Sequence, residues 1–379
     1  MGKGGKYLNK KVHITRKKST KKILFIILVI LLLLIALAVI AGISYYKYLL
    51  SFIVRPADVV TPPTISAAID TTPTEQYSTE ETIEPVATEW TWPVIVSDEN
   101  ITNIMLVGQS SREGEEHLIA DTMILCSINR ETKTLTLTSL MRDMRLVWPK
   151  YVDTLGKTHT GNNRINMAYN MGYHWTGNIQ DSMDLLEDIV SYNFGVDVER
   201  TVEIDFGIFI KFIDLLGGIE IDISEEELAY LQKTAEETGY LKVGKNKVHG
   251  YHALCYARMR KVGHGDYERT ERQREVIISV LNQLKKKSIF DMGWIVKQVL
   301  PMVKTDMTNE EITNYALEFI PMLKDLKIQS QRIPFDGNEI SIQVEIDGVL
   351  DNQIAPKDLA ATARQLQESI GMVVVPATE

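Results

Sequence analysis

The chain has 379 residues, 45% of them hydrophobic, and a formal net charge of −9 at pH 7. Residues 1–55 contain eleven Lys or Arg and no Asp or Glu, so subtraction from the totals of 41 basic and 50 acidic residues leaves −20 on the remainder. This acidic remainder argues against a nucleic-acid partner, because such binding depends on Lys and Arg that neutralise phosphates.

A long apolar run lies near the N-terminus. Ile23 to Ile43 are 21 consecutive apolar residues, which as a helix would extend about 30 Å, enough to cross a bilayer. Nine of the eleven cations precede this run, which predicts a cytoplasmic N-terminus and an extracellular remainder. A cleaved signal peptide would have a shorter apolar core, of about 7–15 residues. We therefore expect a cytoplasmic basic tail over 1–22 and a single-pass transmembrane helix over 23–43.

Residues 44–93 are expected to form an extracellular tether. Six of the twelve prolines lie between residues 56 and 93, interleaved with Thr and Glu. A segment of this composition cannot bury a core and favours an extended, disordered chain. It would hold the following domain at some distance from the membrane.

From residue 94 the pattern becomes that of a globular α/β domain. Apolar, β-branched runs predict strands at 101–107, 122–128, 134–139, 202–205 and 219–223. Helical spacing of apolar residues predicts helices at 182–192, 206–216, 267–286 and 309–324. Strands that alternate with helices predict a three-layer α/β/α sandwich with a central mixed sheet. Residues 94–290 would form this domain, and residues 291–379 would be either its C-terminal extension or an accessory region.

Two patterns suggest other chemistry. Cys126 and Cys255 lie far apart in apolar surroundings, which is compatible with an extracellular disulfide or with two free buried thiols. The segment from Gly239 to Asn246 has the spacing of a phosphate-binding P-loop, but Asn246 stands where a Ser or Thr must bind magnesium. No clear apolar strand precedes that segment, so we expect no nucleotide site.

An Arg-rich stretch from Tyr256 to Glu275 is the most informative part of the chain. Arg258 and Arg260 are two residues apart in a segment expected to be a strand or otherwise extended, which would place both on one face. The fork of a guanidinium group binds phosphate oxygens through two hydrogen bonds. This pair therefore indicates an anion-binding surface.

The helix expected after this pair continues the pattern. Asp266 is a candidate cap, and Arg269, Arg272 and Gln273 are spaced i, i+3 and i+4, so they are expected to share one helix face. A cation in the first turn opposes the helix dipole unless an anion lies beside it, so Arg269 at this position favours a phosphate site. The alternative is a solvated helix whose cations are paired with its own glutamates.

Polar side chains at two strand ends suggest the same chemistry. Arg142 and Asp143 follow the strand 134–139, and loops after the carboxyl ends of strands are where ligands gather in α/β sheets. Asp121 begins the strand 122–128 and could ligate a divalent cation, although an aspartate there is also typical of a turn.

These features occur together in the LytR-CpsA-Psr family, which the chain resembles over residues 100–285. The matching blocks, in the family's order and spacing, are NIMLVGQ (103–109), ADTMILCSINRETKTLTLTSLMRDM (120–144), RINMAYNMG (164–172), VEIDFGIFIKFIDLLGGIEIDI (202–223) and GYHALCYARMR with GDYERTERQRE (250–275). The basic tail, the single anchor and the tether match the family as well.

The resemblance implies an α/β/α sandwich with an apolar tunnel or groove, held outside a bacterial membrane. Family members bind glycopolymers linked to polyprenyl pyrophosphate and transfer the glycopolymer phosphate to the C6 hydroxyl of N-acetylmuramic acid in peptidoglycan. By position, Asp121 would bind Mg²⁺, and the catalytic residues would be Asp121, Arg142, Arg258 and Arg260. The residues expected to contact the pyrophosphate are Arg142, Arg258, Arg260, Arg269 and Gln273.

Two positions depart from the family pattern. Ser110 stands where members usually carry an acidic residue, and Ile119 stands where they usually carry an arginine. One metal ligand and one phosphate contact would thus be missing. Two hypotheses follow: an active phosphotransferase, or a degenerate member that binds polyprenyl-pyrophosphate lipids without efficient transfer, as a scaffold or regulator. A transcription regulator is disfavoured by the outward topology and the acidic charge.

Overall fold

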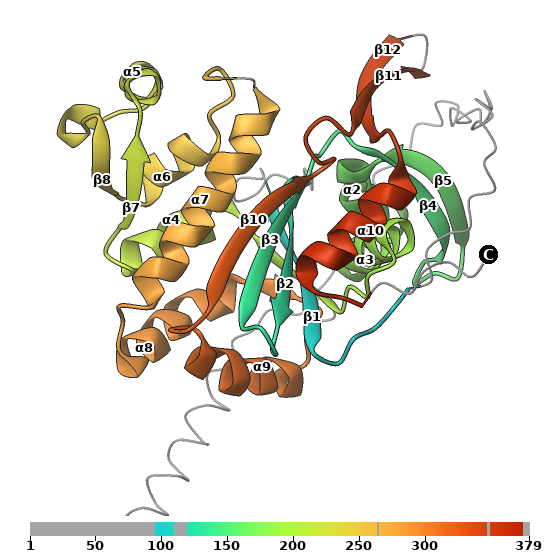
Figure 1. The fold of residues 1–379 in the computed structure, drawn as a ribbon, viewed down its shortest axis with the longest axis horizontal. Coiled ribbons are helices and arrows are strands. Elements are labelled where there is room, and N and C mark those ends of the chain that lie inside the picture. Colours follow the sequence, from blue (N-terminus) through green and yellow to red (C-terminus); the bar gives the residue numbers. More distant parts are fainter. Residues whose placement is uncertain (1–94, 110–119, 264, 347–348, 374–379) are drawn as a thin grey trace, which may run out of the picture. The chain divides into compact units, whose positions relative to one another are not determined.

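A computed structural model describes residues 95–109, 120–263, 265–346 and 349–373 (Figure 1). Its centre is a six-stranded sheet in the order β10-β3-β2-β1-β6-β9. The strands are β1 (Ile101–Gln109), β2 (Ala120–Asn129), β3 (Thr134–Leu140), β6 (Arg200–Ile204), β9 (Lys304–Thr305) and β10 (Lys327–Ile333). The pairs β1/β6 and β3/β10 are parallel and the other pairs are antiparallel. The predicted central mixed sheet is confirmed.

Side-chain alternation along the strands divides the core between the two faces of the sheet. Met105 and Met123 belong to a buried cluster that includes residues of α2, α3 and α10. The neighbouring Leu106 and Ile124 belong to a different cluster, which includes Ile277 of α7. Figure 1 shows α7 on one side of the sheet and the other three helices on the opposite side. The three layers follow from this period of two.

The remaining elements extend the two helical layers. On one side lie α2 (Ile165–Thr176), α3 (Ile179–Phe194) and α10 (Leu359–Ile370), with the ribbons β4 (Arg145–Val152)/β5 (Thr158–Arg164) and β11 (Glu339–Ile346)/β12 (Val349–Pro356). A third buried cluster joins α4 (Phe206–Leu215), α5 (Glu225–Thr234), α6 (Gly250–Ala257), α7 (Asp266–Leu284) and α8 (Ile289–Val299) to β7 (Ile219–Ile223)/β8 (Gly244–Val248). Helix α9 (Asn309–Met322) follows β9.

All the predicted strands and helices up to residue 224 are present, with ends that differ by a few residues. The extended segment expected at Arg258 and Arg260 is wrong, because α6 continues to Ala257 and Arg258 caps it with helical dihedral angles. Residues 291–379 contribute both edge strands of the sheet, β9 and β10. Cys126 and Cys255 are free and half-buried.

The predicted N-terminal segments lie outside the described residues. These are the basic tail over 1–22, the transmembrane helix over 23–43 and the tether over 44–93. Among the residues that the structure does describe, no helix combines the length and the apolar character needed to cross a membrane.

Helix α7 begins differently from the sequence expectation. Its N-cap is Gly265, with a φ of +80° that favours glycine, and Asp266 is the first helical residue rather than the cap. Almost two turns further on, the buried Arg272 donates to Glu227 Oε1 at 2.7 Å and to the carbonyl groups of Met259 and Val262, each at 3.2 Å. Arg272 therefore ties α7 to α5 and holds the loop that carries Arg260.

We predict that Arg272→Met lowers the free energy of unfolding by about 3–5 kcal/mol, because it leaves the carboxylate of Glu227 buried without its cation. Denaturant unfolding of the full chain measures this loss. The exposed Arg364 on α10 provides the matched control, since Arg364→Met removes an exposed guanidinium group. A loss for Arg272→Met no larger than that of the control would show that the ion pair does not hold the loop.

A second prediction concerns Glu187 on α3. Burial, together with the charges of Asp306 and Asp184, raises the pKa of Glu187 to about 9. The folded state thus favours the protonated acid, and stability is lost as pH rises from the ordinary glutamate range through about 9. Glu187→Gln should raise stability by about 1 kcal/mol or more at pH 8, and by much less at pH 5.

Thermal unfolding at the two pH values measures this effect. Glu310→Gln, at an exposed position on α9, should show no such pH-dependent gain. If the Glu187→Gln variant unfolds with the wild type at both pH values, the carboxyl group is not protonated in the folded chain.

Candidate functional site

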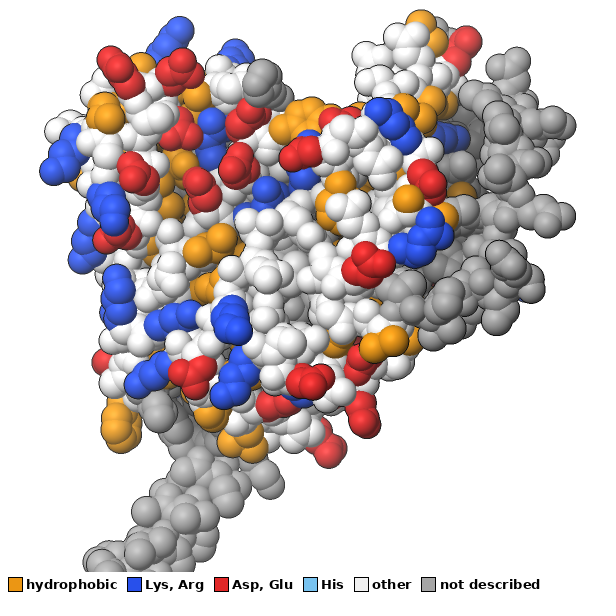
Figure 2. All heavy atoms as spheres, in the orientation of Figure 1, with side chains coloured by type: hydrophobic (Ala, Val, Ile, Leu, Met, Phe, Trp, Pro, Cys, Tyr) orange, Lys and Arg blue, Asp and Glu red, His pale blue; other side chains and the backbone are white. Residues whose placement is uncertain are grey.

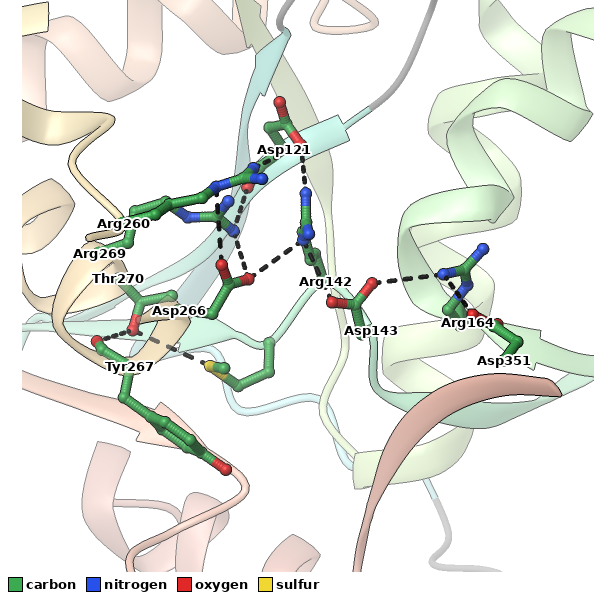
Figure 3. Close-up of polar contacts among 11 residues, drawn as sticks. Asp121, Arg142, Asp143, Arg164, Arg260, Asp266, Tyr267, Arg269, Thr270 and Asp351 are labelled. Atoms are coloured by element: carbon green, nitrogen blue, oxygen red, sulfur yellow. Dashed lines mark hydrogen bonds and ion pairs between the residues drawn. The ribbon is translucent and has the colours of Figure 1, made fainter. Parts of the chain in front are cut away.

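Charged side chains from distant segments meet where the inner strand β2 begins and its neighbour β3 ends (Figure 3). Strands β2 and β3 are antiparallel, so the start of β2, with Asp121, lies beside the end of β3, which Arg142 follows. The N-terminus of α7 brings Asp266 and Arg269 to the same end of these two strands. Arg260 comes from the loop that Arg272 holds. The structure therefore brings together four of the residues predicted from sequence: Asp121, Arg142, Arg260 and Arg269.

Asp266 is the centre of this group. Its Oδ2 atom lies 2.9 Å from Arg269 Nη2 and 3.1 Å from Arg142 Nε, and its Oδ1 atom lies 3.6 Å from Arg260 Nε. One carboxylate thus contacts three guanidinium groups. As the first residue of α7, Asp266 also places its negative charge at the positive end of the helix dipole.

Asp121 lies on the other side of the same arginines. Its Oδ1 atom is 3.1 Å from Arg142 Nη1 and 3.6 Å from Arg260 Nη2. Arg269 Nη2 lies 3.4 Å from the backbone carbonyl oxygen of Asp121. The side chain of Asp121 is about one quarter exposed, so it can meet a ligand.

The ion pairs continue away from this centre. Arg142 Nε lies 3.2 Å from Asp143 Oδ2, and Arg164 Nη1 lies 3.6 Å from Asp143 Oδ1 and 3.4 Å from Asp351 Oδ1 (Figure 3). The role of Asp266 as a hub and the presence of Arg164 and Asp351 were not predicted. Arg164 begins the block RINMAYNMG, which is the one sequence signal that could have indicated it.

Arg269 is the most deeply buried cation of the group. Its side chain is 2% exposed, and its Nε and Nη1 atoms have no hydrogen-bond partner in the described part of the chain. Burial and the nearby cations Arg260 and Arg142, against the opposing charge of Asp266, together lower the pKa of Arg269 to about 10. Two buried N–H groups without acceptors are costly, so this position favours an added anion.

Two predicted residues do not join this group. Arg258 is exposed, and its guanidinium carbon lies 4.5 Å from the ring centroid of Phe206. Its predicted alignment with Arg260 on a strand is wrong because Arg258 belongs to the end of α6. Gln273 is half-buried on α7, and its side chain forms no hydrogen bond with another described residue.

The predicted metal site rests on Asp121 alone. Among the described residues, no group of three or more His, Cys, Asp and Glu side chains is placed to hold a metal ion. Asp121 nevertheless fits Mg²⁺, which is commonly held by one or two carboxylates together with substrate phosphates and water. Both of its recorded ion pairs use Oδ1, which leaves Oδ2 for such a role. Ser110 and Ile119 lie outside the described residues.

Comparison with known proteins finds relatives that align with most of the chain. The chain is 27% identical over 291 residues to biofilm regulatory protein A of Streptococcus mutans, covering 73% of this chain and 66% of that protein, just under two thirds. It is 26% identical over 281 residues to the polyisoprenyl-teichoic acid–peptidoglycan teichoic acid transferase TagU of Bacillus subtilis, covering 73% of this chain and 80% of TagU.

Solved structures share the fold. The crystal structure of B. subtilis TagT aligns with a TM-score of 0.52 at 19% identity, covering 72% of this chain and 92% of TagT. A structure described as TagT bound to LIIa-WTA gives a TM-score of 0.53 at 21% identity, with the same coverage. The model of the LytR_cpsA_psr family matches residues 65–367. Since this match spans most of the sequence and includes every residue of the site, the chain belongs to the LytR-CpsA-Psr family.

Proposed function

We propose that this protein is a transferase that attaches teichoic acid, or a related glycopolymer, to peptidoglycan. Membership of the family and the similarity to TagU support this assignment. In the finer form of the proposal, the donor is a glycopolymer on a polyprenyl-pyrophosphate carrier, and the glycopolymer phosphate moves to the C6 hydroxyl of N-acetylmuramic acid. The chain would be a single-pass protein of a bacterial cell membrane, anchored by residues 23–43, with its domain on the extracellular face.

The observation that carries this proposal is the incomplete pairing of buried Arg269. Its Nε and Nη1 atoms lack hydrogen-bond partners within the part of the chain that the structure describes. Arg142 and Arg260, the latter 43% exposed, contact the same carboxylate as Arg269, that of Asp266. A pyrophosphate presents several anionic oxygens, which could satisfy these donors through charge-assisted hydrogen bonds. A buried guanidinium group with two unsatisfied nitrogen atoms, beside a more exposed guanidinium group, suits such a ligand.

The chemistry expected at this site is charge neutralisation and positioning. Phosphoryl transfer spreads negative charge over the equatorial oxygens of the phosphate, and fixed guanidinium groups stabilise that charge without reorganisation. Asp266 and Asp121 hold Arg142 and Arg260 in place for this task. If Mg²⁺ binds at Asp121, it supplies further neutralisation of the phosphate oxygens.

Asp121 is also placed to influence the attacking hydroxyl group. Its Oδ1 atom already contacts two guanidinium groups, at 3.1 and 3.6 Å. A carboxylate engaged in this way is better suited to orient a metal or a hydroxyl group than to accept its proton. We therefore assign Asp121 to metal binding and positioning first.

The second candidate is a degenerate member that binds the lipid pyrophosphate without efficient transfer. Ser110 and Ile119 favour it, because they stand where the family usually has a metal ligand and an arginine. The close balance between arginines and aspartates in the site also favours a degenerate member, because a substrate phosphate must compete with the resident carboxylates.

We predict that Arg142→Ala lowers the transfer rate by about one to two orders of magnitude. The loss corresponds to one charge-assisted hydrogen bond of about 1.5–3 kcal/mol, if all of it is realised in the transition state. The assay follows transfer from a polyprenyl-pyrophosphate glycopolymer to peptidoglycan oligomers by the full chain with Mg²⁺. Arg364→Ala on the exposed face of α10 should retain full activity. Equal activity of Arg142→Ala and the wild type would contradict the assignment.

The two candidate functions separate in the same assay. The transferase proposal predicts turnover by the wild type that is lost on removal of Mg²⁺ and restored by adding it back. A protein that binds the lipid donor but shows no turnover would support the degenerate reading. In that case Ser110→Asp combined with Ile119→Arg should create measurable transfer, because it restores both missing groups.

A further inference from the structure

A cavity separate from the arginine–aspartate site lies between α7 and the end of β10. Its volume is about 620 Å³. Its lining includes Tyr267, Glu271 and Arg274 from α7, and Arg332, Asp336 and Glu339 from β10 and the residues that follow it. In the face drawn in Figure 2, basic side chains lie in the recess between these two elements and acidic side chains stand around it.

Arg274 is a buried cation that has no ionic partner among the described residues. Its side chain is 7% exposed, its Nη1 atom donates to Ser139 Oγ at 2.8 Å, and its Nε atom has no acceptor among the described residues. No carboxylate in the described part of the chain lies within ion-pair distance of it. Burial lowers the pKa of Arg274, against the opposing charges of Glu271 and Glu275. A guanidinium group in this state favours an anionic ligand.

The second arginine of the cavity is already neutralised. Arg332 forms ion pairs with Asp336 and Glu339, and its guanidinium carbon lies 4.3 Å from the ring centroid of Tyr267. This cation therefore does not compete with Arg274 for a ligand anion. The contrast between the two arginines identifies Arg274 as the anchoring point.

Carboxylates at the mouth restrict the kind of anion that can enter. Glu271 is exposed, and the side chain of Asp336 is 92% exposed. A ligand with only negative charge would be repelled by these groups, whereas a ligand that also carries an ammonium group would be attracted by them. The rings of Tyr267 and Phe335 add apolar surface to the same lining.

We propose that this cavity binds a zwitterionic amino acid or short peptide, with the carboxylate on Arg274 and the ammonium group near Glu271 and Asp336. Helix α7 links the cavity to the arginine–aspartate site, because Asp266 and Arg269 face that site while Tyr267 and Arg274 line the cavity. Thr270, between them, contacts Met141, the neighbour of Arg142 (Figure 3). As a subsite for the peptide branches of a peptidoglycan acceptor, the inference rests on the proposed function.

The test measures binding of three matched probes to the full chain by saturation-transfer nuclear magnetic resonance. The probes are the dipeptide alanyl-alanine, its C-terminal amide and its N-acetyl form, which lack the anion and the cation respectively. We expect the zwitterion to bind most tightly, and each modified probe to bind at least several-fold more weakly. Equal binding of the zwitterion and the amide would overturn the proposal, as would no binding of any probe.

Two variants locate the binding within the cavity. Arg274→Gln should weaken zwitterion binding about tenfold or more, whereas the exposed control Arg364→Gln should leave it unchanged. Glu271→Lys provides a second readout at an exposed position, should Arg274→Gln fail to fold. It should weaken the zwitterion and strengthen the N-acetyl probe, which keeps only the anion. If neither variant changes the order of the probes, they bind elsewhere.

The outcome is independent of the transfer assay. A wild-type protein that transfers glycopolymer but binds no zwitterion overturns only this inference. A protein that binds the zwitterion through Arg274 but shows neither transfer nor binding of lipid pyrophosphate overturns only the proposed function.

Discussion

The site depends on the position of one carboxylate. Asp266 lies at the first residue of α7 and contacts the guanidinium groups of Arg142, Arg260 and Arg269, which come from a strand end, a loop and the helix itself. Three cations so close together would repel one another without it. The helix N-terminus favours a negative charge at this position for a separate reason, the direction of its dipole.

The rest of α7 is arranged so that this contact can form. Its apolar side packs against the sheet through Ile277 and against the helical cluster through Val276. Arg272 holds the preceding loop, and with it Arg260, through two backbone carbonyl groups. Arg274 faces the separate cavity. One helix thus combines structural, anion-binding and cavity-lining arginines.

The pattern of alternation and helical spacing was sufficient to predict most of the central fold. Strands such as 101–107 and 134–139 are buried on both faces, and their continuous apolar or β-branched character is a strong local signal. The ribbons β4/β5 and β11/β12 were not predicted. Their strands contain many polar residues and their pairing depends on partners elsewhere in the fold. The edge strand β9 has only two residues, too few for any period.

For the site, sequence spacing identified the residue types better than their partners. Arg142, Arg260, Arg269 and Asp121 meet as predicted from the family blocks. Arg258 instead lies over the ring of Phe206, because α6 extends to it. Arg272 instead forms an ion pair with Glu227. Asp266 resembled a helix cap in the sequence, because a cap and a first-turn ion pair have the same local pattern. Only the tertiary fold distinguishes these alternatives.

In the proposed function, the unsatisfied N–H groups of Arg269 donate hydrogen bonds to the oxygen atoms of a lipid pyrophosphate. A calorimetric titration of the full chain with geranyl pyrophosphate, a short-chain analogue, measures this binding. We expect the wild type to bind and Arg269→Met to bind at least tenfold more weakly, with folding of the variant verified by circular dichroism. Equal affinity of the two proteins for geranyl pyrophosphate would contradict this role of Arg269.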